Sequence, residues 1–142
     1  MTKAILAAGL QVEFLDGGTW YTAPEPVDIG NIGDVGNFVD VTHLASSARE
    51  YIPGLRDTEE KTMSFRFIDD NADQIRLRGL ADAQTSTQFR VTFPATVDAG
   101  TKARATFTMA LSAQQVESPT PDGALNLIIA GRVSGTTAWT TV

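Results

Sequence analysis

Residues 62–94 read TMSFRFIDDNADQIRLRGLADAQTSTQFRVTFP, and the pattern of apolar residues in them indicates the fold class. Apolar and polar side chains alternate strictly at 62–67 and again at 88–93, a pattern typical of strands that bury one face. The apolar members of the two runs are Met63, Phe65, Phe67, Phe89, Val91 and Phe93. The stretch therefore predicts two strands, each with one face in the core, separated by a segment of a different kind.

The segment between the two runs begins with the acidic cluster DDNAD at 69–73. Asn and Asp favour the N-cap of a helix, and Gln74 lies close to the position that a capping box requires. We predict a helix over 71–83, although the order Ile75-Arg76-Leu77-Arg78 also alternates as a strand would. The cluster lacks the glycine and the bidentate glutamate of an EF-hand, so capping is preferred over calcium binding.

Alternation continues on both sides of this stretch. Near the C-terminus it runs over 104–112 and, after the breaker SPTPDG at 118–123, over 125–133, which predicts two long antiparallel strands joined by a turn. Near the N-terminus, QVEFLD and TWYT flank Gly17-Gly18, which predicts a tight hairpin because glycine reaches positive φ at little cost.

A further strand is predicted to run through PVDIGNIGDV and into NFVDV, with bulges at its glycines. The spacing of those glycines matches neither a dinucleotide fingerprint nor a P-loop. With seven or eight strands and no βαβ alternation, the chain is expected to be mainly β: an antiparallel β-sandwich or barrel with one flanking α-helix. We expect residues 1–142 to form a single domain.

Composition excludes several classes of function. The 142 residues contain no cysteine, so disulfides and thiolate chemistry are absent. A formal net charge of −6 argues against wrapping nucleic acid, because such binding depends on neutralisation of phosphates by Lys and Arg. No apolar run approaches the ~20 residues of a membrane helix.

No catalytic constellation is convincing. Asp40, His43 and Ser46 or Ser47 could be arranged as a Ser-His-Asp triad, but triads are made by the fold, so their closeness in sequence counts for little. We interpret His43 as a polar loop histidine and predict no enzymatic activity, cofactor or metal. Aromatic residues next to arginines, as at 65–67, could stack on single-stranded nucleic acid, but alternation places those aromatics in the core.

Residues 40–57, DVTHLASSAREYIPGLRD, followed by the strand TMSFRF, resemble the tail tube (major tail) proteins of long-tailed, non-contractile bacteriophages. The resemblance extends in layout over the whole chain, including the start MTKAILAAG, the helix in mid-chain and the C-terminal strand pair. It implies a structural virion protein of the phage tail, assembled in the host cytoplasm. It also implies hexameric rings that stack into a tube, with sheets joined around a lumen through which DNA passes without specific binding.

The resemblance implies that the long loop at 40–57 reaches onto neighbouring subunits or the adjacent ring. The subunit-interface residues would be Val41, Thr42, His43, Leu44, Arg49, Glu50, Tyr51, Ile52, Pro53, Gly54 and Leu55. Other partners would be a tape-measure protein, a tail terminator and distal tail proteins. No immunoglobulin-like C-terminal domain is expected.

An acidic lumen would let DNA slide without sticking. Possible lumen-facing acids, in or beside predicted strands, are Glu13, Asp16, Asp28 and Glu117. The alternatives are the tube protein of a contractile tail or type VI secretion system, a small β-sandwich binding module, and an unrecognised hydrolase with His43 as its base.

Overall fold

A computed structural model describes residues 8–57, 60–94, 101–117 and 119–142. Nine strands and one helix lie within these ranges. They are β1 (Gln11–Asp16), β2 (Thr19–Ala23), β3 (Pro26–Asp28), β4 (Val35–Asp40), β5 (Tyr51–Asp57), β6 (Glu60–Arg66), α1 (Ala72–Asp82), β7 (Ser86–Thr92), β8 (Ala103–Val116) and β9 (Asn126–Thr141).

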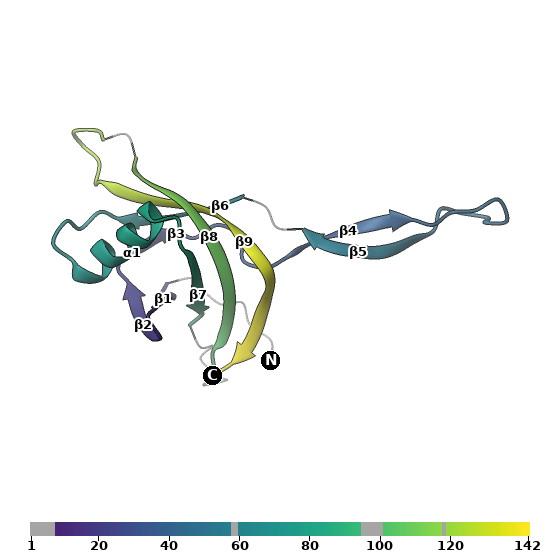
Figure 1. The fold of residues 1–142 in the computed structure, drawn as a ribbon, viewed down its shortest axis with the longest axis horizontal. Coiled ribbons are helices and arrows are strands. Elements are labelled where there is room, and N and C mark those ends of the chain that lie inside the picture. Colours follow the sequence, from purple (N-terminus) through teal and green to yellow (C-terminus); the bar gives the residue numbers. More distant parts are fainter. Residues whose placement is uncertain (1–7, 58–59, 95–100, 118) are drawn as a thin grey trace.

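Seven strands form one antiparallel sheet in the order β2-β1-β7-β8-β9-β6-β3. The sheet curls strongly, so that the body is a half-barrel, with β2 and β3 as its edge strands (Figure 1). This is the barrel form of the predicted architecture rather than two facing sheets. The inward side chains are those that alternation predicted: Met63, Phe65, Phe89, Val91, Phe107, Met109, Leu127 and Ile129 are buried.

The two C-terminal strands are longer than predicted and form the backbone of the half-barrel. β8 and β9 pair along most of their lengths, with register shifts between Thr106 and Thr108 and between Leu111 and Ala113. Gly131 lies opposite Leu111, and a Cβ at Gly131 would meet the Ala110 carbonyl oxygen at 2.4 Å. The two strands therefore approach closely at a point that only glycine accommodates.

The helix confirms the capping prediction and explains its weak periodicity. Asn71 is the N-cap, and its side chain accepts a hydrogen bond from the Gln74 backbone N–H at 2.9 Å. Gln74, Leu77 and Ala81 are buried against the sheet, while Ile75 is exposed. The Gln74 side chain does not complete a capping box, because its Oε1 accepts from Ile68 N and its Nε2 donates to Arg66 O, each at 2.7 Å.

The N-terminal hairpin also agrees with the prediction. β1 and β2 pair from Val12–Ala23 to Asp16–Thr19, and Gly17 and Gly18 form the two-residue turn with φ of 60° and 84°. Positive φ at both positions is what a type I′ turn requires.

The predicted strand through 26–41 is wrong as a single element. β3 pairs with β6 in the main sheet, whereas β4 pairs with β5 in a separate two-stranded sheet. The glycines at 30 and 33, which take φ of 66° and 130°, lie in the connection between them. The chain changes sheets there because glycine can adopt these conformations without strain.

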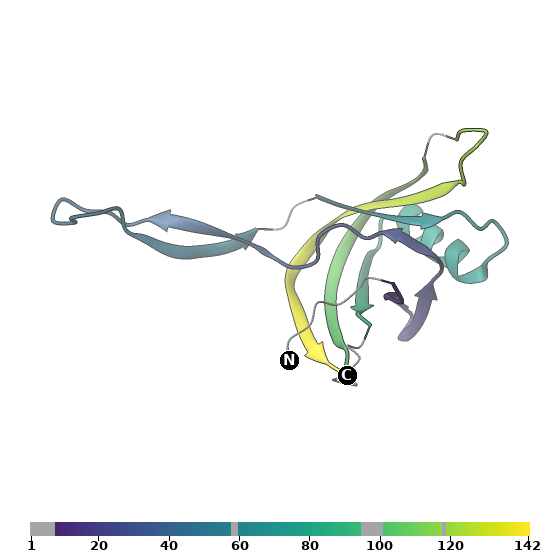
Figure 2. The same ribbon diagram turned by 180° about the vertical axis from the view of Figure 1, so that it is seen from behind.

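Residues 35–57 form a hairpin that projects from the half-barrel, and we call it the arm (Figures 1 and 2). The prediction of a long loop at 40–57 is therefore wrong for residues 51–57, which are the strand β5. Pro53 and Gly54 lie inside β5, beside the point at which the β4–β5 register shifts between Gly36 and Phe38. Proline fits beside such an irregularity because it removes a ladder donor.

Candidate functional site

The arm exposes apolar side chains on both of its faces. Val39 pairs with Ile52 on one face, and Phe38, which pairs with Pro53, lies with Tyr51 on the other, because successive residues of a strand point to opposite sides. Phe38 is 73% exposed and Leu55 is 90% exposed. Exposed apolar surface concentrated on one element is typical of an interaction site.

The tip of the arm, residues 41–50, is held by its own polar groups. Val41 N donates to Glu50 O and Glu50 N donates to the Thr42 hydroxyl, both at 2.9 Å. Arg49 donates to the Asp40 carboxylate at 3.0 Å, and hydrogen bonds from Thr42 hold the pKa of Asp40 below its usual value. Leu44 takes no part in these hydrogen bonds, and its side chain is fully exposed. The tip thus presents an apolar side chain on an ordered turn.

His43 lies in the tip but does not form a triad with its neighbours. Its Nδ1 accepts from Ala45 N at 3.3 Å, and its Nε2 lies 3.4 Å from a Glu50 carboxylate oxygen. The Ser46 hydroxyl donates to Glu50 at 2.7 Å, and the Asp40 carboxylate is bound by Thr42 and Arg49. The histidine therefore contributes to the shape of an exposed turn.

We expect His43→Ala to leave both folding and assembly nearly intact. The side chain is 64% exposed, and exposed substitutions of this kind change the free energy of unfolding by about 0.5 kcal/mol or less. Thermal melting and electron microscopy of the variant check this result. Loss of assembly in a normally folded variant would contradict it and make His43 a dominant residue of the contact between subunits.

The base of the arm is joined to the half-barrel by a carboxylate that the sequence analysis missed. Asp34, just before β4, accepts hydrogen bonds from Thr137 in β9, both from its backbone N–H at 3.0 Å and from its hydroxyl at 3.1 Å. Arg56 of β5 donates to the same carboxylate at 3.2 Å. The backbone hydrogen bond from Thr137 is the main reason that the pKa of Asp34 is lowered.

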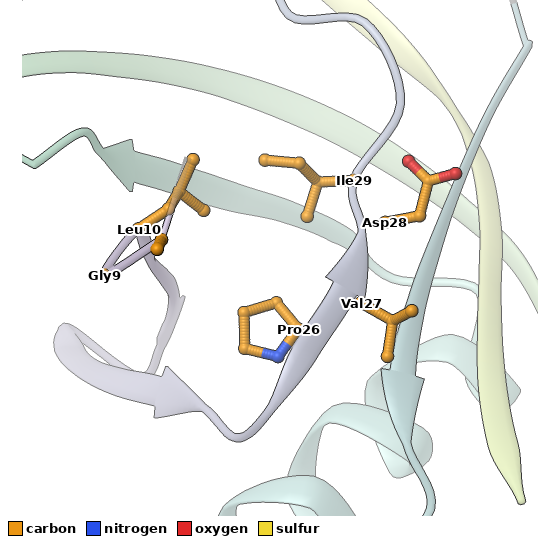
Figure 3. A pocket seen from close by; sticks show the side chains of 7 residues that line it. Gly9, Leu10, Pro26, Val27, Asp28 and Ile29 are labelled. Atoms are coloured by element: carbon orange, nitrogen blue, oxygen red, sulfur yellow. The ribbon is translucent and has the colours of Figure 1, made fainter. Parts of the chain in front are cut away.

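A pocket of about 360 Å³ marks the open seam of the half-barrel. Leu10, just before β1, faces Pro26 and Ile29 across it (Figure 3). Of the seven residues that line it, Asp28 alone has a titratable side chain. The lining is thus suited to apolar contact.

The structure does not bring together the four acids predicted to face a lumen. Glu13 forms a bidentate pair with Arg90, at 3.1 and 2.8 Å, and Asp16 pairs with Arg76 at 3.2 Å. These two acids point to opposite faces of β1, since Asp16 shares the side of the buried Phe14. Asp28 accepts a hydrogen bond from Gly30 N, and Glu117 accepts one from the Asn126 side chain, each at 2.9 Å.

Of the aromatic side chains next to arginines, Phe65 and Phe89 lie in the core, as alternation predicted, whereas Phe67 is only partly buried. Phe65 and Phe89 are buried, while Arg66 donates to Asn126 and Arg90 lies 4.1 Å above the ring of Trp20. Within the described ranges, no group of three or more acidic or histidine side chains is arranged to hold a metal ion. No helix in the described part of the chain is long and apolar enough to span a membrane.

Comparison with known structures finds the same fold in tail and injection tubes. The protein in the tail of an empty GTA particle, refined with C6 symmetry, is 22% identical with a TM-score of 0.69, and the match covers 96% of this chain and 99% of that one. The SPP1 tail tube is 14% identical with a TM-score of 0.70, covering 96% and 79%. A chain of the sheath–tube complex of the PVC contractile injection system is 9% identical with a TM-score of 0.73, covering 98% and 93%.

The sequence itself matches a protein family. A search of curated proteins gave no match. The profile described as "Phage tail tube, TTP, lambda-like" matches residues 3–127, which is most of the chain. The chain therefore belongs to the lambda-like family of phage tail tube proteins, which are structural components of the virion tail.

Proposed function

We propose that the chain polymerises as stacked, hexameric rings that form the tail tube and conduct DNA during delivery. Membership of the tail tube family supports polymerisation into a tube. The number six is supported by the C6 symmetry of the GTA tail, whose protein has the same fold.

The exposed arm is the observation that carries this proposal. A lone two-stranded hairpin is at best marginally stable in water, and this one exposes most of the Phe38, Leu44 and Leu55 side chains. Burial of apolar area stabilises by about 25 cal/mol per Å², so a second copy that covers these side chains would favour assembly. Because both faces of the arm are apolar, the arm is suited to lie between two neighbouring subunits.

We propose that Arg49 and Tyr51 are the strongest anchors of this contact. Arg and Tyr are enriched among the residues that dominate binding energy at interfaces. Both are exposed, and Tyr51 begins β5 next to the ordered tip. The remaining contact residues are proposed to be Val41, Thr42, His43, Leu44, Glu50, Ile52, Pro53, Gly54 and Leu55.

The edges of the seven-stranded sheet suggest how a ring closes. β2 and β3 are edge strands, and unpaired edges invite pairing with another chain. A head-to-tail contact must close into a ring or propagate as a filament. We propose that edge contacts close the ring and that the arm links one ring to the next, so that one chain makes both kinds of contact.

The lumen is proposed to be acidic or neutral rather than basic. A net charge of −6 keeps a polyanion from binding along the tube. Because Glu13 and Asp16 are already paired with arginines, Asp28 and Glu117 would contribute more to the repulsion of DNA if they face the channel.

The proposed partners beyond the chain itself are the tape-measure protein, the tail terminator and the distal tail proteins. Residues 1–142 are proposed to act as one domain.

Electron microscopy of the purified protein over a range of concentrations tests this function. Rings or tubes are expected, either above a threshold concentration or after addition of an initiating tail-tip complex. A monomer under all of these conditions would contradict the proposal. The presence of a sheath gene beside this one would favour the contractile tube, which shares the fold.

A further inference from the structure

The connection between β3 and β4 has one part that is fixed to the half-barrel. Ile29 and Ile32 pack against the hydrophobic core. The Lys61 ammonium, from β6, donates a hydrogen bond to the Asn31 carbonyl. Residues 29–32 are therefore fixed to the half-barrel and are not part of the arm.

The next residue, Gly33, is suited to act as a hinge between the half-barrel and the arm. Its φ is 130°, a conformation that side-chain-bearing residues rarely adopt, and a Cβ placed there would meet nothing within 4 Å. No packing at this residue restrains the backbone. Hinges in proteins are a few connecting residues that absorb changes in φ and ψ. Without a further restraint, the arm could take a range of angles to the sheet.

Asp34, the residue after Gly33, supplies such a restraint. Its side chain is 5% exposed and binds Thr137 of β9 and Arg56 of β5. Thr137 lies where the β8–β9 register shifts, between the pairs Thr106–Ala138 and Thr108–Ser134, so its N–H is available to a partner outside the ladder. The carboxylate of the residue just before the arm thus binds both the returning strand of the arm and the main sheet.

We infer that Asp34 is a positioning residue that holds the arm at one angle to the half-barrel, with Thr137 and Arg56 as its partners. The inference rests on the proposed function, because the angle matters when the arm must meet a neighbouring copy. An arm already held in its binding direction loses less conformational freedom on contact, which strengthens assembly without adding any contact. Asp34 itself is nearly buried, so its role does not require it to touch the neighbour.

The test must separate this role from simple stabilisation of β9. The chain has no cysteine, so spin labels can be placed at two introduced cysteines alone. Ser47→Cys labels the tip of the arm and Ser86→Cys labels the exposed face of β7, and neither residue belongs to the Asp34 cluster. Double electron–electron resonance on the dilute protein then measures the distribution of distances between tip and body.

The labelled protein is compared with Asp34→Ala, Asp34→Asn and the control Asp70→Ala, which removes an exposed carboxylate before α1. We expect one narrow distribution in the parent and in Asp70→Ala, and a broad one in Asp34→Ala. Asp34→Asn should be intermediate, because the amide oxygen still accepts from Thr137 but the ion pair with Arg56 is lost. The concentration required for assembly should rise about tenfold or more in Asp34→Ala, which corresponds to 1.4 kcal/mol.

A narrow distribution in Asp34→Ala, in a protein that melts cooperatively, would overturn the inference. If Asp34→Ala does not fold, Asp34→Asn decides the question, and an unchanged distribution in that variant would overturn it as well. The distance measurement does not depend on assembly. Failure of the parent to form rings would therefore contradict the proposed function while the positioning role of Asp34 is still judged by the distances.

Discussion

Shortening the arm should abolish tube formation and leave the half-barrel folded. The change replaces residues 38–53 by Asn-Gly, the dipeptide favoured in two-residue hairpins, and keeps Asp34 and Arg56 at the base. The replaced segment contains Phe38, Leu44 and Tyr51, which are exposed, and none of its residues belongs to the core of the half-barrel. We expect no rings or tubes by electron microscopy at any concentration at which the parent assembles.

The melting temperature is the control for this variant. It should stay within about 5 °C of the melting temperature of the parent. A change of ~1 kcal/mol in the free energy of unfolding shifts the melting temperature of a domain of this size by only a few degrees. Loss of cooperative melting would show that the arm belongs to the folding unit of the body. Normal tubes built from the shortened chain would contradict an intersubunit role for the arm.

Gly131→Ala should cause the largest loss of stability among single substitutions that add one methyl group. The new Cβ would lie 2.4 Å from the Ala110 carbonyl oxygen and 2.9 Å from Met109 Cε, so the two longest strands would have to separate. Overpacking of this kind typically costs up to about 3 kcal/mol of stability. The clash with the Ala110 carbonyl oxygen cannot be relieved by the rotation of a side chain, because that oxygen belongs to the backbone. Chemical denaturation of the purified variant measures the change in the free energy of unfolding.

Gly79→Ala is the matched control for this substitution. Gly79 lies in the interior of α1, is exposed, and has open space where its Cβ would be. Alanine there should stabilise the protein by about 0.5–1 kcal/mol, because glycine loses more conformational freedom in a helix. Equal effects of the two substitutions would contradict the role assigned to the close approach at Gly131.

The half-barrel could be predicted from the sequence because its core follows a strict period of two. The side chains at positions 63, 65, 89 and 91 are all buried, so the alternation in the sequence correctly predicts that they lie in the core. The helix could be predicted from its N-cap, since the Asn71 side chain accepts from the backbone N–H of Gln74, only three residues away. Its buried face was harder to predict, because the buried residue in its first turn is Gln74, a polar side chain that bonds to the end of β6.

The arm could not be predicted in the same way, because it has no buried face to impose a pattern. Phe38 and Val39 are neighbours on opposite faces, and both are exposed. Asp34 was missed for a related reason. It lies in a glycine-rich stretch that is typical of a turn, and its main partner, Thr137, is separated from it by 103 positions in the sequence. Only the folded chain brings these two residues together.

A cryo-electron microscopy map of particles assembled from the purified chain would show directly whether the arm joins subunits into a tube. We expect stacked rings with an open lumen, in which the arm of each subunit lies against another copy and buries Phe38, Leu44 and Leu55. A map in which these side chains remain in solvent, or an assembly without a lumen, would contradict this expectation.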